Sequence, residues 1–211
     1  MSSASPTATT EPAAAAQGRV RLRRFAALAI PATVAGGVLV VLTAQGALAA
    51  QFAISGMPFT VTATQLTGQG LEQYGGIDNV APGSPNLGDA NGQQPVIISA
   101  MRSASLTDLC QSVNLGFVNL VIHAGSSSPV EATTLVTDSD SITGDASFTN
   151  LTVDKDASKL NEVPHVHGGL GTFGQQADVV VIKNLRQDNW ATTASTFTLP
   201  GMSISFSGTP C

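Results

Sequence analysis

Short runs in which apolar and polar side chains alternate fill residues 51–211, and this pattern constrains the fold more than any other feature. A two-residue period is typical of half-buried strands. Gly, Pro, Asn and Asp separate the runs, as expected of turns. No window of comparable length carries an apolar stripe with the helical period. We therefore predict strands at residues 59–64, 96–101, 113–123, 130–137, 147–153, 177–185, 193–199 and 202–206.

These runs predict a mainly β domain, built as an antiparallel sandwich, a jelly roll or a folded-over sheet of about eight strands. Only 11% of the chain is charged, and Ser and Thr take the place of charged residues on the wet faces of the strands. Residues 69–94 contain Gly75-Gly76, Pro82-Gly83 and Asn91-Gly92, so we expect a long loop there.

A charge-free apolar run covers residues 25–44, before the β region. About 20 apolar residues are long enough to cross a hydrocarbon core of roughly 30 Å as a helix. Four basic residues precede the run and should stay cytoplasmic, which places everything after residue 50 outside the membrane. They are Arg19, Arg21, Arg23 and Arg24.

Two interpretations of this segment remain open. Ala47-Leu48-Ala49 followed by Ala50 has the form of a signal peptidase site, with cleavage between Ala49 and Ala50. The length of the apolar run instead favours a retained signal anchor. The expected organisation is a disordered cytoplasmic lead at 1–18, a signal peptide or signal-anchor helix at 19–50, and an exported β domain at 51–211, at the cell surface or secreted.

Charge divides sharply between the two parts of the chain. In residues 1–50, four arginines against one glutamate give +3, whereas residues 51–211 carry five basic and thirteen acidic residues, giving −8. The exported part has no basic stripe that could neutralise phosphates. We therefore expect no nucleic-acid partner, and contact with the membrane through the N-terminal helix.

Both cysteines, Cys110 and Cys211, lie in the exported part. An even number of cysteines in an oxidising compartment predicts a disulfide between them. The alternative is that Cys211 pairs with another molecule.

Candidate catalytic and metal-binding patterns are weak. Residues 201–205, Gly-Met-Ser-Ile-Ser, approach the Gly-x-Ser-x-Gly elbow of hydrolases but lack the second glycine and lie in an expected strand. His165 and His167 could present two imidazoles to a metal, yet Pro164 and the following glycines favour a surface loop, and nothing selects His123, Glu162 or Asp156 as a third ligand. We expect no cofactor.

Acidic residues gather between residues 138 and 156. Asp138, Asp140, Asp145, Asp154 and Asp156 do not have the spacing of an EF-hand, because Ile142 occupies the fifth loop position and no Glu closes the loop. We interpret them as turn-forming residues on a solvated edge.

Several segments resemble an uncharacterised family of exported actinobacterial proteins, some of which carry the label cholesterol esterase. The segments are residues 23–25 (Arg-Arg-Phe), 45–50 (Gln-Gly-Ala-Leu-Ala-Ala), 73–76 (Gln-Tyr-Gly-Gly), 109–112 (Leu-Cys-Gln-Ser), 145–151 (Asp-Ala-Ser-Phe-Thr-Asn-Leu), 175–178 (Gln-Gln-Ala-Asp) and 190–193 (Trp-Ala-Thr-Thr). The resemblance implies a paired cysteine, an N-terminal membrane segment and partnership with a small multispanning membrane protein. It brings no catalytic residues with it.

Two hypotheses for function follow. The first is a non-catalytic cell-envelope protein whose exported domain binds a protein partner or an apolar ligand. The alternative is an exported, esterase-like hydrolase with an atypical or metal-assisted site, using His165 and His167.

Overall fold

The structure, a computed structural model, describes residues 53–88 and 92–211. The predictions for residues 1–50, including the four arginines and the Ala49–Ala50 cleavage site, lie outside the described residues. Within the described part, no helix has the length and apolar character of a membrane span. The elements are β1 (Ala53–Ile54), β2 (Phe59–Val80), β3 (Gln93–Thr107), β4 (Leu109–Asn114), β5 (Asn119–Ala124), β6 (Val130–Thr149), β7 (Thr152–Asp156), the 3-10 helix η1 (Ala157–Lys159), β8 (Phe173–Thr193), β9 (Thr196–Thr198) and β10 (Ser203–Ser207).

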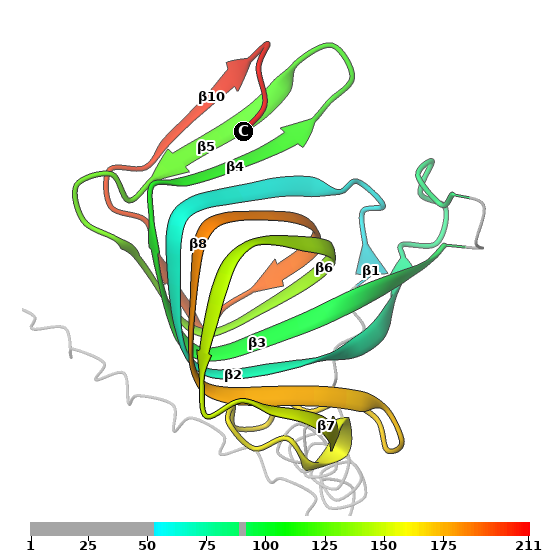
Figure 1. The fold of residues 1–211 in the computed structure, drawn as a ribbon. Helices are drawn as coiled ribbons and strands as arrows, with labels where there is room; N and C mark the ends of the chain where they lie inside the picture. Colours follow the sequence, from blue (N-terminus) through cyan, green and yellow to red (C-terminus); the bar gives the residue numbers. More distant parts are fainter. Residues whose placement is uncertain (1–52, 89–91) are drawn as a thin grey trace, which may run out of the picture. The chain divides into compact units, whose positions relative to one another are not determined.

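All ten strands belong to one sheet, which confirms the mainly β prediction (Figure 1). The main path runs β10-β5-β4-β2-β3-β6-β8-β7, with β1 beside β2 and β9 beside β6. Every pairing is antiparallel except that of β1 with β2.

Four long strands close this sheet on itself. β2 pairs with β3, β3 with β6 and β6 with β8, and the ring is completed where Phe59–Ala63 of β2 pair with Leu185–Asn189 of β8. Figure 1 shows β2, β6 and β8 bending sharply, so each of them contributes to two walls of the ring. The inner faces of these strands therefore surround one interior.

The loop predicted at residues 69–94 is wrong over most of its length. β2 continues to Val80, and Gly75 and Gly76 pair with Ile97 and Val96 of β3. A glycine still has the backbone groups that a ladder requires. A larger residue in place of Gly76 would meet the terminal methyl group of Ile98, which would have to move.

Strand boundaries elsewhere differ because turns interrupt the apolar alternation. The strand predicted at 113–123 is two strands, since a turn joins β4 to β5 through a hydrogen bond from Leu115 N to Val118 O (2.9 Å). Asn114 Oδ1 accepts from Gly116 N (2.7 Å) and supports this turn. β8 extends to Thr193, and of the strand predicted at 193–199 only the short β9 forms in addition.

A main apolar core fills part of the ring interior. Its buried members include Val61, Leu66, Met101, Val130 and Leu185, contributed by β2, β3, β6 and β8. A smaller cluster of Tyr74, Ala157 and Leu160 lies under η1 and the loop that leads to β8.

Gly70 changes which side chains of β2 point into the ring. Leu66 packs in the main core, Gln69 is exposed, and after Gly70 the inward positions are Leu71 and Gln73. Gly70 has φ +67°, and an added Cβ would lie 2.8 Å from the carbonyl oxygen of Glu162. Such a backbone suits glycine and shifts the alternation by one residue.

Candidate ligand-binding cavity

The interior of the ring contains a cavity of about 410 Å³. This volume falls within the range of roughly 300–1,000 Å³ that is usual for small-molecule sites. All four ring strands contribute side chains to its wall. The lining residues are Leu66, Leu71, Gln73, Tyr74, Gly75, Ile97, Ser99, Met101, Ile142, Thr143, Gly144, Ala146, Phe148, Phe173, Gln175, Val180, Ile182 and Gln187.

The inner wall of the cavity is continuous with the main core. Leu66, Leu71, Met101 and Val180 belong to both. Gly68 allows Met101 to lie against β2, because an added Cβ would stand 2.5 Å from the sulfur of Met101. The core therefore ends at an open apolar wall.

A chain of polar side chains crosses one side of the cavity. Gln175 Nε2 donates to Gln73 Oε1 (2.7 Å), and Gln73 Nε2 donates to Ser99 Oγ (2.9 Å). These residues come from β8, β2 and β3. Each amide has hydrogen-bonding capacity beyond these contacts, so these side chains can bind a carbonyl or hydroxyl group.

Sequence reasoning missed these polar residues. Gln73 falls in the segment that was predicted to be a loop, and Gln175 precedes the start of the strand predicted at 177–185. Gln175 alternates with Phe173 and Ala177, and this apolar context was the available signal for an inward-facing glutamine.

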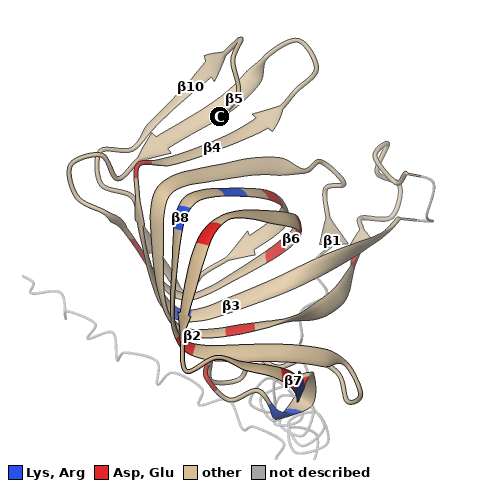
Figure 2. Ribbon diagram, viewed as in Figure 1, with Lys and Arg blue, Asp and Glu red and all other residues tan. Residues whose placement is uncertain are grey.

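Among the described residues that line the cavity, there is no Lys, Arg, Asp, Glu or His. Figure 2 shows the charged residues at scattered positions along the ribbon. An ionised group placed inside without a partner of opposite charge would be costly. Ile97, Phe148 and Phe173 line the cavity and are also exposed, which places them at its mouth.

A buried carboxyl group holds the loop on the outer face of β2. Glu72 is fully buried, and its Oε1 accepts from the backbone N–H of Val163 (2.7 Å). Among the described residues, Oε2 has no hydrogen-bond partner. Burial raises the pKa of Glu72, while the backbone hydrogen bonds from Val163 and Glu162 oppose this shift. Glu72 thus attaches the loop after η1 to the ring.

A pair of acidic residues, Asp78 and Asp138, lies near Tyr74. Burial, together with the negative charge of the neighbouring Asp78 and a hydrogen bond with it, raises the pKa of Asp138 to about 7. Burial also raises the pKa of Asp78, and that of Tyr74 to about 12. Two hydrogen-bonded carboxyl groups in such a site are stable when they share a proton.

The interpretation of Asp138 as a turn residue on a solvated edge is therefore wrong. Asp138 and Asp140 lie within β6, and Asp140 accepts a hydrogen bond from Trp190 Nε1 (3.2 Å). Asp138 pairs with Ile98 of β3, on the face of the sheet that carries the Tyr74 cluster, and its carboxyl group meets that of Asp78 there.

The two candidate metal-binding histidines are separate from the cavity. His165 and His167 are exposed in the loop between η1 and β8, and Val166 between them packs against the Tyr74 cluster. Among the described residues, no group of three His, Cys, Asp or Glu side chains is arranged to hold a metal.

The three possible third ligands have other contacts. Asp156 caps η1 and accepts hydrogen bonds from Ser158 Oγ (2.7 Å), Gly171 N (2.8 Å) and Ser158 N (2.9 Å), which lower its pKa. Glu162 accepts from Gln176 Nε2 (3.2 Å). His123 lies on β5.

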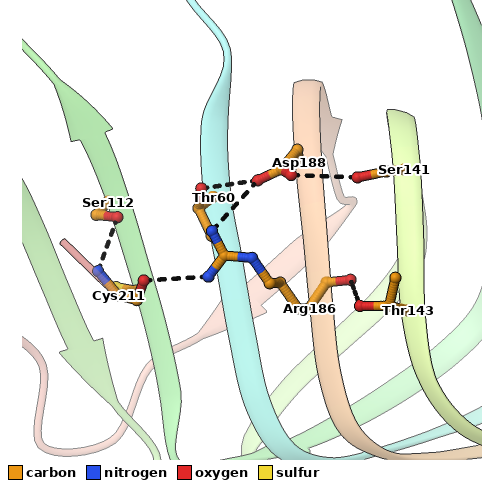
Figure 3. A network of polar contacts seen from close by, with 7 residues as sticks. All are labelled: Thr60, Ser112, Ser141, Thr143, Arg186, Asp188 and Cys211. Atoms are coloured by element: carbon orange, nitrogen blue, oxygen red, sulfur yellow. Dashed lines mark hydrogen bonds and ion pairs between the residues drawn. The ribbon is translucent and has the colours of Figure 1, made fainter.

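Cys110 and Cys211 form a disulfide, as predicted. Cys211 is also held by a hydrogen bond from its N–H to Ser112 Oγ (3.1 Å) and by one from Arg186 Nη1 to its carbonyl oxygen (3.2 Å) (Figure 3). Arg186 lies 3.9 Å from Asp188, which accepts from Thr60 Oγ1 (2.8 Å). The network joins the last residues to β4, β2 and β8.

A separate hollow of about 220 Å³ brings Ser203 near two residue types used in hydrolysis. Ser203 of β10 pairs directly with His123 of β5, and both line the hollow together with Asp108. Asp108 accepts from Thr64 Oγ1 (3.1 Å). The serine lies in a strand, without the strained turn of a nucleophile elbow.

Comparison with known proteins identifies a family without assigning an activity. No curated protein and no solved structure matches the chain. The family match covers residues 55–211, which include β2 to β10 and every residue that lines the cavity. The chain therefore belongs to DUF6230, a family of unknown function.

Proposed function

We propose that this protein is a non-catalytic cell-envelope protein whose exported domain binds an apolar ligand inside the ring of β2, β3, β6 and β8. One observation carries the proposal, namely the cavity of about 410 Å³ that opens directly from the apolar core. A domain of this size would ordinarily fill such a space with side chains. An unfilled space with an apolar wall is typical of a ligand-binding site.

The lining also limits the chemistry of the ligand. The described residues of the wall include no Lys, Arg, His, Asp or Glu, and Tyr74 is neutral at physiological pH, so the ligand is uncharged over the part that is enclosed. The chain of Gln175, Gln73 and Ser99 provides one polar strip for a hydroxyl, ester or carbonyl group. A neutral lipid with a single polar group fits both features.

Export rests on the sequence of the N-terminal segment. The charge-free run at residues 25–44 follows four arginines, and the paired cysteines suit an oxidising compartment. In this arrangement the domain works outside the membrane, within reach of envelope lipids or of a multispanning membrane protein.

Gly75 offers a direct test of the cavity. Its Cβ position lines the cavity and has no atom within 4 Å, so Gly75→Leu adds a side chain to open space. We expect the full-length protein to bind the neutral dye N-phenyl-1-naphthylamine saturably, and Gly75→Leu to weaken this binding at least tenfold. Fluorescence titration measures both affinities.

Gly208→Leu is the matched control, because it adds the same side chain to open space outside the cavity. Its dye affinity should equal that of the wild type. Hexadecanol should displace the dye at a concentration at least tenfold lower than palmitate at pH 8, because the carboxylate would be buried without a partner. Equal dye binding by Gly75→Leu and the wild type would exclude the cavity as the site.

A hydrolase is the second candidate, favoured by one observation, the shared hollow of Ser203, His123 and Asp108. Hydrolysis of p-nitrophenyl butyrate that is lost in Ser203→Ala and retained in Ser205→Ala would support it. Activity that instead requires added zinc and His165 would support the metal-assisted form. Absence of turnover under both conditions would remove this candidate.

A further inference from the structure

Five apolar side chains surround the mouth of the cavity and are exposed to solvent. Ile97 is 40% exposed, Phe148 38% and Phe173 56%, and all three line the cavity. Ile77 lies two residues beyond Gly75 on the same face of β2 and is 56% exposed. Val153 is paired with Gln175 and is 53% exposed. We call these five residues the apolar rim.

The rim differs from an ordinary wet surface. It consists of two phenylalanines and three β-branched aliphatic residues from five strands, β2, β3, β6, β7 and β8. Exposed apolar side chains gathered around one opening are typical of an interaction site. Because the rim surrounds the opening, whatever covers it also meets the ligand path.

The position at which the chain enters the domain indicates which structure the rim faces. β1 pairs with Asn79 and Val80, so Ala53 lies at the end of β2 that carries Ile77. Only residues 45–52 separate β1 from the apolar run at 25–44, which we expect to be in the membrane. Eight extended residues span at most about 29 Å. A retained anchor therefore holds Ala53 no more than about 29 Å from the end of that run.

Charge distinguishes the mode of attachment. Residues 51–211 carry a net charge of −8, so an anionic bilayer repels the domain as a whole. The rim has no charged member, and its contribution is apolar insertion. Salt screens the repulsion and leaves apolar insertion intact, so attachment through the rim should not weaken as salt rises.

We propose that the apolar rim docks on the surface of the lipid bilayer and that the ligand enters the cavity from the bilayer. This inference rests on the proposed ligand-binding function. Direct transfer spares an apolar molecule the passage through water, which is the main barrier to its movement.

Photo-crosslinking of the full-length chain tests the docking. The chain is reconstituted into vesicles of phosphatidylethanolamine and phosphatidylglycerol at 3:1, which contain a lipid with a diazirine in its acyl chain. After irradiation, peptide mass spectrometry locates the labelled residues. We expect labels on peptides containing Phe148 and Phe173, with a yield that does not fall between low and high salt.

Paired variants connect docking with ligand entry. Phe148→Ser with Phe173→Ser should reduce labelling of these peptides, and dye uptake from preloaded vesicles, at least tenfold. Dye affinity at equilibrium in detergent should change less than threefold. Ile204→Ser with Phe206→Ser removes two exposed apolar side chains of β10 and should leave both readouts unchanged.

Three results would overturn the docking. They are labels confined to residues 25–44, rim labels that Phe148→Ser with Phe173→Ser leaves unreduced, and equal uptake by the two paired variants. Failure of the cavity itself is recognised separately, by dye binding that Gly75→Leu leaves unchanged. Rim labels together with that result would retain the docking and remove the proposed ligand site.

Discussion

Removing the Cys110–Cys211 disulfide should destabilise the domain substantially. The bond closes a loop with a sequence separation of 101 residues. For a loop of this length the chain-entropy relation gives about 4.7 kcal/mol at 25 °C. Cys110→Ala with Cys211→Ala should therefore lower the free energy of unfolding by up to about 4.7 kcal/mol, and Tm by roughly 9–19 °C at about 2–4 °C per kcal/mol.

Urea denaturation of the full-length chain measures this difference, with the fluorescence of the single Trp190 and the far-UV circular dichroism as two probes. Ser112→Ala is the control, because it removes only the hydrogen bond from Cys211 N and should cost about 1 kcal/mol. A loss below about 1 kcal/mol in the double variant, with an unchanged m-value, would refute the entropic reasoning. A wild-type dimer on a non-reducing gel that disappears on reduction would show that Cys211 pairs between molecules.

Two further predictions concern buried backbone and buried charge. Because the folded state holds the pKa of Asp138 at about 7, above its ordinary 3.8, the native protein binds more protons than the unfolded chain between these values. The free energy of unfolding should fall as pH rises from about 4 to about 7. Urea titrations at several pH values measure this slope, and Asp138→Asn should flatten it. A slope of opposite sign would contradict the shared proton with Asp78. Gly70→Ala should cost more than about 1 kcal/mol, because it adds a collision with the Glu162 carbonyl to the strain of φ +67°. Gly83→Ala has a similar φ of +81° but open space, so calorimetry of the two variants isolates the collision, and equal losses would count against it.

Parts of the fold could be predicted where the sequence pattern of a segment is decided within that segment. Runs such as 130–137 and 202–206 correspond to β6 and β10, because a strand shows its two-residue period within its own sequence. Gly75 and Gly76 suggested a loop, because glycine is a local signal for turns, whereas the partner strand β3 decides that they are paired. The boundary errors have the same cause, since a turn such as 115–118 depends on which strands it must connect.

The candidate site was harder to predict from the sequence than the strands were. The cavity is lined by residues from 66 to 187, and no sequence window contains more than a part of it. Gln73 and Gln175 lie 102 residues apart, and their hydrogen bond exists only because the ring brings β2 and β8 together. Asp78 and Asp138 became a buried pair for the same reason.

By itself, the sequence determined the strand content, the surface of hydroxyl side chains, the net charge of −8 in residues 51–211 and the two cysteines available for pairing. These properties follow from composition and from periods of a few residues. Only the tertiary structure decided that β2 closes on β8, that the ring encloses an uncharged cavity, and that five separate strands form an apolar rim. Long-range hydrogen-bond register selects which faces meet, and that selection is a property of pairs of distant segments rather than of either segment alone.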